Sequence, residues 1–202
     1  MPVTDNLIKE LNADRTKGFI ERLAKKLRDE NYNINEVLDL TFHNDKKIGF
    51  RAAWLLDTLM TGNPELYINN LEYFIKRIPG VKNESCKRHY ARILFHLTMP
   101  NAPLAVRNSL AAIDMEYVVE KCFDWIIDPK VKVAVKVFAA DVLFNLHNRY
   151  DWIKDELTNQ VQFMMRDGGP AIQSRGKKLL AAIEVKIKKS KFKNQTCRQS
   201  RF

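Results

Sequence analysis

The chain has 202 residues, of which 46% are apolar and 29% are charged, and this composition excludes a disordered chain. Seven glycines and seven prolines are few for an all-β fold with many tight turns. No apolar run approaches the roughly 20 residues of a membrane span, and the first residues lack the pattern of a secretory signal. Cys86, Cys122 and Cys197 are odd in number and widely spaced, which predicts reduced thiols and a cytoplasmic protein.

The net charge of +10 comes mostly from the end of the chain. Residues 185–202 contain no acidic residue and seven basic ones: Lys186, Lys188, Lys189, Lys191, Lys193, Arg198 and Arg201. Residues 1–184 hold 27 basic and 24 acidic residues, a net charge of +3. We therefore expect a nearly balanced folded body and a basic tail. The tail either solvates the protein or contacts nucleic acid, an acidic protein or an anionic membrane surface.

From the amino terminus onward, we expect a segment at 1–13, a repeat domain at 14–184 and the tail at 185–202. The first helix of the repeat domain carries a degenerate apolar stripe of Ile20, Leu23, Ala24 and Leu27. A short helix around 34–42 follows it.

One apolar pattern then recurs at positions i, i+4, i+7, i+8 and i+11, which form one face of an α-helix. Its four clear copies begin at Ile48, Cys86, Val135 and Ile172. Nineteen of the twenty positions are apolar, and Gly176 is the other. The copies are 38, 49 and 37 residues apart, near the roughly 40-residue period of helix-pair repeats.

A second helix is expected after each of the first three clear copies, at 64–78, 114–127 and 151–166. The longest interval contains an insertion at 98–113, which we expect to be a loop with one short helix. Three pairs of a capping residue and a proline, Asn63-Pro64, Asp128-Pro129 and Gly169-Pro170, predict helix starts.

The repeat copies contain RAAWLL at 51–56, HYARIL at 89–94, FAADVL at 138–143 and RGKKLL at 175–180. With these segments, residues 14–184 resemble the HEAT and armadillo-like repeat families. The resemblance implies an all-α fold, a short α-solenoid of about four to five stacked antiparallel helix pairs. It also implies that the second helices hold an extended partner.

Sequence motifs for common catalytic centres are missing. Neither GxGxxG nor GxxxxGK[ST] occurs, and HExxH, paired CxxC and GxSxG are also missing. Cys86, His89 and His96 share one helix, but Cys86 has the register of a core residue, so we expect no metal and no cofactor. The sequence favours binding over catalysis, although scattered residues could form a site that no motif shows.

We consider two binding functions. The first is a non-catalytic protein-interaction scaffold, with partner contacts at Trp54, Tyr73, Arg77, Tyr117, Lys121 and Trp125. The alternative is a nucleic-acid-binding module that uses the basic tail, or a DNA glycosylase, because glycosylases built from HEAT-like repeats carry tryptophan and aspartate on a concave surface. Trp125 and Asp128 are the candidates for that role. A structural interpretation competes with it, in which Asp128 caps a helix and the indole fills the core.

Overall fold

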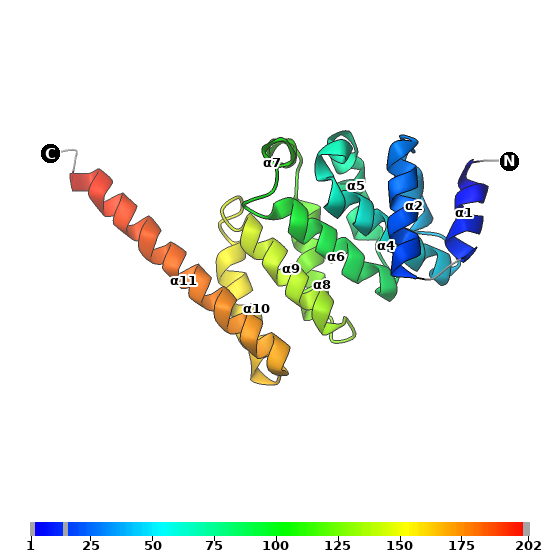
Figure 1. The fold of residues 1–202 in the computed structure, drawn as a ribbon. Helices are drawn as coiled ribbons and strands as arrows, with labels where there is room; N and C mark the ends of the chain where they lie inside the picture. Colours follow the sequence, from blue (N-terminus) through cyan, green and yellow to red (C-terminus); the bar gives the residue numbers. More distant parts are fainter. Residues whose placement is uncertain (1–2, 14–15, 200–202) are drawn as a thin grey trace. The chain divides into compact units, whose positions relative to one another are not determined.

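The computed structural model describes the backbone of residues 3–13 and 16–199 and the side chains of residues 5–13 and 16–184. Within these ranges the chain forms helices and no strand (Figure 1). The helices are α1 (Val3–Ala13), α2 (Lys17–Asp29), α3 (Ile34–Leu40), α4 (Lys46–Gly62), η1 (Pro64–Asn70), α5 (Leu71–Arg77), η2 (Ile78–Gly80), α6 (Glu84–Thr98), α7 (Leu104–Ala112), α8 (Glu116–Ile127), α9 (Val133–Leu146), α10 (Ile153–Arg166) and α11 (Pro170–Gln199). The all-α prediction is confirmed.

The chain divides into two compact units, Met1–Val142 and Leu143–Phe202. In the first unit, α4 is the central helix and contacts α2, α3 and α6. The second helices α5 and α8 contact each other, and α5 also contacts α3. The first helices of successive repeats therefore form one layer and the second helices form another.

The apolar face of the first helices forms the core. All fifteen positions of the copies that begin at Ile48, Cys86 and Val135 are buried. In the fourth copy Gly176, Leu179 and Ile183 are buried, whereas Ile172 and Leu180 are half-buried. The repeated pattern thus marks the positions that each helix removes from water, which is the main source of stability in such a fold.

Short polar side chains set where several helices begin. Asp45 accepts a hydrogen bond from the Lys47 amide at 2.8 Å, and Asn83 accepts one from the Ser85 amide at 3.0 Å. The expected start at Asp128-Pro129 is wrong, because α9 begins only at Val133. Asp128 instead accepts a bond from the Lys130 amide in the turn before that helix.

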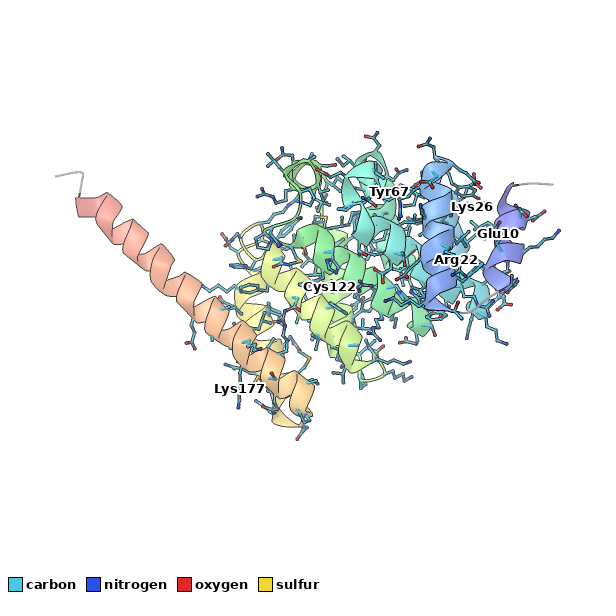
Figure 2. All side chains as sticks on the ribbon, viewed as in Figure 1. Glu10, Arg22, Lys26, Tyr67, Cys122 and Lys177 are labelled. Atoms are coloured by element: carbon cyan, nitrogen blue, oxygen red, sulfur yellow. The ribbon has the colours of Figure 1, made fainter. Side chains whose placement is uncertain are left out.

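Helix α1 is attached to the repeat helices by two polar contacts. Arg51 of α4 is buried and donates to the Leu11 carbonyl and to Asn12 Oδ1, each at 2.8 Å. Lys26 of α2 lies 2.6 Å from Glu10 of α1, and Figure 2 shows the two side chains between these helices. Helix α1 (Val3–Ala13) therefore belongs to the first unit together with the repeat helices.

Helix α7 lies within the interval 98–113, where the sequence predicts one short helix. It contacts η1, α5 and α6. Val106 and Leu110 are its buried side chains, whereas Leu104 is exposed. Helix α7 thus packs against both η1 and α5 of the second-helix layer and α6 of the first-helix layer.

Gly49 gives a test of how closely α4 approaches the end of α3. A Cβ atom at this position would lie 2.9 Å from the Thr41 carbonyl oxygen, closer than such atoms normally come. We expect Gly49→Ala to lower the free energy of unfolding by about 1 kcal/mol, because a cost of about 1–3 kcal/mol from overpacking exceeds the gain in helix propensity. Urea unfolding followed by circular dichroism measures this change.

Gly62 is the control, because it belongs to the same helix and is exposed. Its added Cβ atom would meet only the end of the Arg28 side chain, at 3.9 Å. Gly62→Ala should change the free energy of unfolding by less than about 0.5 kcal/mol. Equal effects of the two substitutions would contradict the close contact at Gly49.

In the second unit, α10 and α11 pack against each other. An added Cβ atom on Gly176 would meet Met165 and Val161, so the small residue lets the two helices approach closely. The helix α11 continues to Gln199, but the side chains of 185–202 lie outside the described residues. In the described part of the chain, every helix is too short or too polar to cross a membrane.

Candidate functional site

A groove of about 620 Å³ lies on the first helices α4, α6 and α9. We call it the Trp54 groove. Its lining residues are Phe50, Trp54, Asp57, Glu84, Ser85, Arg88, His89, Arg92, Lys132, Ala134, Val135 and Phe138. The rings of Phe95 and Phe138 lie 5.7 Å apart and join α6 to α9 beside the groove. The groove lies entirely within the first unit.

Asp57 is the buried charge that organises the Trp54 groove. Its side chain is 1% exposed, on a helix whose other buried residues are mostly apolar. Asp57 Oδ2 lies 2.9 Å from His89 Nδ1 and 2.9 Å from an Arg92 guanidinium nitrogen. Because an isolated buried carboxylate is strongly unfavourable, these two contacts hold α4 and α6 in a fixed arrangement.

The second oxygen of Asp57, Oδ1, is buried and has no hydrogen-bond partner among the described residues. Buried oxygens of this kind are uncommon in folded proteins. The carboxylate can therefore accept a further hydrogen bond without losing those to His89 and Arg92.

Aromatic rings cover His89 on the groove side. The Trp54 and His89 rings are stacked, with centroids 6.5 Å apart and planes at 19°. Phe50 lies 5.5 Å from His89 and 6.2 Å from Trp54. Trp54 is half-buried, so this cluster gives the groove an apolar floor that remains accessible.

The charges at the rim of the Trp54 groove are mostly positive. Arg88 and Lys132 are exposed, and neither has an ion-pair partner among the described residues. The Arg92 side chain is 44% exposed although it also pairs with Asp57. The acidic rim residue Glu84 forms an ion pair with Lys87, which leaves a positive surface around the aromatic floor.

The groove lacks the contact expected of an activated nucleophile. Asp57 and His89 form a carboxylate–imidazole pair, the kind that serves in general acid–base catalysis. Ser85 lies one helical turn before His89, but the Ser85 hydroxyl makes no hydrogen bond to that ring. The arrangement of the described side chains suits the binding of a ligand.

The structure places the expected contacts Tyr73 and Arg77 together on α5, away from Trp54. The Tyr73 hydroxyl donates to Asp39 at 2.6 Å, and Arg77 pairs with the same carboxylate at 3.2 Å. The hydrogen bond to Asp39 raises the pKa of Tyr73. The Arg77 guanidinium also lies 4.2 Å above the Phe42 ring, so both side chains are held by contacts within the protein.

Tyr117 lies in a second groove, of about 490 Å³, on the second-helix layer. We call it the Tyr117 groove. Its lining residues are Ile68, Asn69, Glu72, Ile75, Lys76, Ser109, Ala112, Ile113, Asp114 and Tyr117. The Tyr117 ring is 58% exposed, and nearby Lys121 lies 3.5 Å from Asp124.

Trp125 lines neither the Trp54 groove nor the Tyr117 groove. It is 1% exposed and is one of the largest buried side chains of the first unit. The expectation that its indole contacts a partner is therefore wrong, and so is its placement on a concave surface beside Asp128. The competing interpretation of a core indole is confirmed, because Trp125 lies on the same apolar stripe of α8 as Val118 and Cys122.

The structure gives different surroundings to the three residues of α6 that we considered as metal ligands, Cys86, His89 and His96. The Cys86 thiol lies 3.8 Å from the Thr41 carbonyl oxygen, and burial raises its pKa to about 12. His89 pairs with Asp57, whereas the His96 ring lies edge-on against Phe95. Burial lowers the pKa of His96, and so does the charge of Arg92. Nowhere in the described ranges do three His, Cys, Asp or Glu side chains gather in a metal-binding arrangement.

Sequence reasoning identified Trp54 but missed Asp57, His89 and Arg92 as its partners. The signal that could have found them is the acidic residue in the apolar segment LLDTLM at 55–60. In the structure this carboxylate is 1% exposed, and a buried charge requires partners, which here come from α6.

Comparison with known proteins supports the repeat architecture. The model of the HEAT repeat domain family matches residues 7–183. The search of curated proteins found no match, and the search of solved structures found none. Because the family model covers most of the chain, including all four copies of the apolar pattern, this protein belongs to the HEAT repeat domain family.

Proposed function

We propose that the protein is a non-catalytic interaction scaffold that binds another protein in the Trp54 groove. The observation that carries this proposal is the accessible aromatic cluster of Trp54, Phe50 and His89, held in place by the buried Asp57. Tryptophan and arginine are the residues that most often dominate protein interfaces, and here Trp54 and Arg92 line one groove. We thus place the contact surface on the first helices, whereas the sequence suggested the second helices.

The Tyr117 groove is the competing surface for a partner. It contains Tyr117, the most exposed of the expected contact residues, and the mixed charges of Glu72 and Lys76. These two charges pair with each other at 2.7 Å, so they offer a partner little net attraction. Arg88 and Lys132 of the Trp54 groove have no ion-pair partner among the described side chains and lie beside its aromatic floor, which favours this groove.

Affinity capture from the native cell tests the proposal. Wild-type protein should recover one protein in stoichiometric amount, and nuclease treatment should not remove it. Trp54→Ala should reduce that recovery at least about tenfold, the effect expected for an aromatic hot spot. Tyr117→Ala is the matched control and should leave recovery unchanged; the reverse pattern would assign the partner to the Tyr117 groove.

Nucleic-acid binding through the tail is a second candidate, supported by the seven basic residues at 185–202. Duplex binding of this kind weakens steeply as salt rises, and deletion of 185–202 should reduce the slope. If nucleic acid alone is recovered in the capture experiment, this candidate replaces the scaffold.

A cytoplasmic location is part of the proposal, because three widely spaced cysteines suit a reducing compartment.

A further inference from the structure

We propose that the segment bound in the Trp54 groove is an acidic peptide with an aromatic residue, supplied by the partner protein. This inference rests on the proposed function and specifies the chemistry of the partner. The groove combines two features that a single ligand has to match. One is the aromatic floor, and the other is the group of cations at its rim.

The cations are arranged to meet carboxylates from outside the chain. Arg88 and Arg92 are four residues apart on α6, so they project from the same side of that helix. Lys132 precedes the first residue of α9 and faces the same groove. Arg88 and Lys132 lack ion-pair partners in the described part of the chain, so a carboxylate there would displace no existing pair.

Asp57 does not cancel this positive charge at the surface. Its carboxylate is buried, and among the described side chains it pairs with His89 and Arg92, so an incoming peptide meets the exposed part of Arg92 instead. Glu84 is occupied by Lys87. The accessible charges of the groove are therefore complementary to an acidic segment.

The floor favours an aromatic side chain between the acidic residues. Trp54 and Phe50 present half-buried rings, and Phe138 of α9 also lines the groove. Aromatic pairs prefer offset or edge-on contacts, and the tilted rings of this cluster accommodate such a contact.

A protein segment fits better than nucleic acid. Binding to a duplex requires several cations spread along one surface to neutralise successive phosphates. Residues 1–184 have a net charge of only +3, and Arg88, Arg92 and Lys132 gather around one groove. Oligonucleotide binding is accordingly an outcome that the test has to distinguish.

The indole signals of the full-length protein provide the readout. Its three tryptophans differ in position: Trp54 lies in the groove, Trp125 is buried and Trp152 is exposed on the second unit. Titration with a short acetylated peptide of glutamates around one phenylalanine should shift the ¹⁵N indole resonance of Trp54 and leave those of Trp125 and Trp152 unchanged. The same peptide with glutamine in place of glutamate should bind at least about tenfold more weakly.

Paired charge variants give the matched control. Arg88→Gln with Lys132→Gln should lower affinity for the acidic peptide about tenfold, because two rim charges are removed. Arg22→Gln with Lys25→Gln removes the same charge from exposed positions on α2 and should leave affinity within about twofold. Figure 2 shows Arg22 on that helix.

Three results would overturn the inference. They are equal binding of the glutamate and glutamine peptides, no shift of the Trp54 signal at millimolar peptide, and tighter binding of a single-stranded oligonucleotide at the groove. The first two reject an acidic ligand but leave the capture experiment with Trp54→Ala to decide the proposed function. If capture fails to depend on Trp54 while the acidic peptide still shifts its resonance, the ligand chemistry stands and the scaffold function does not.

Discussion

Trp125→Ala is expected to lower the free energy of unfolding by about 3–5 kcal/mol, a larger loss than we expect from the other substitutions. The indole of Trp125 is buried inside the first unit, and its removal leaves a cavity that the neighbouring helices fill only in part. Urea unfolding monitored by circular dichroism measures the loss. The folded fraction of Trp125→Ala should still bind the partner, since the residue lies outside the Trp54 groove.

Two further substitutions serve as comparisons for Trp125→Ala. The indole nitrogen has no hydrogen-bond partner among the described residues, so Trp125→Phe removes an unsatisfied group and leaves a smaller cavity. It should cost only about 1–2 kcal/mol. Trp152→Ala, at a residue that is 49% exposed, should cost less than about 1 kcal/mol. If Trp125→Ala unfolded at the same urea concentration as the wild type, the indole would not be in the core.

Arg92→Met is expected to lower the free energy of unfolding by about 3 kcal/mol. Its apolar stem keeps most of the packing, but the buried Asp57 carboxylate would retain only its contact with His89. The cost is that of a buried charge left with too few partners, rather than the modest value of an exposed ion pair. Arg88→Met, on the same helix but exposed and without an ion pair to any side chain that the structure describes, should change stability by less than about 0.5 kcal/mol.

A double-mutant cycle with Asp57 identifies the cause. Adding Asp57→Asn to Arg92→Met replaces the uncompensated carboxylate with a neutral amide, so the double variant should recover about half of the lost stability or more. Additive losses would show that Arg92 stabilises the protein by packing and not through Asp57. Chemical denaturation of the four proteins in one buffer provides the required free energies.

The helix pairs could be predicted from the sequence because the apolar positions within each repeat follow the period of an α-helix. The pattern that begins at Ile48 places five apolar residues on one face of a helix, and all five are buried. The same rule predicted α6 and α9 from Cys86 and Val135. It could also have predicted the burial of Trp125, which lies three residues after Cys122 and seven after Val118.

The Trp54 groove could not be predicted in the same way. Asp57 is separated from His89 by 32 residues and from Arg92 by 35, and their contact depends on how two successive repeats pack. The register of Trp54 suggested an accessible edge, which is correct, but not which side chains surround it. Similarly, the sequence predicted a helix start at Asp128-Pro129, but a turn occupies these residues and α9 begins at Val133.

Photo-crosslinking from position 54 in the native cell most directly tests whether the Trp54 groove binds a protein. A photoreactive phenylalanine derivative at this position should form a covalent product with one protein, and peptide mapping should place the crosslink in a single segment of it. The same group at position 117 should give little product. A product at position 117 and none at position 54, or a crosslink from position 54 to nucleic acid alone, would contradict the proposed interface.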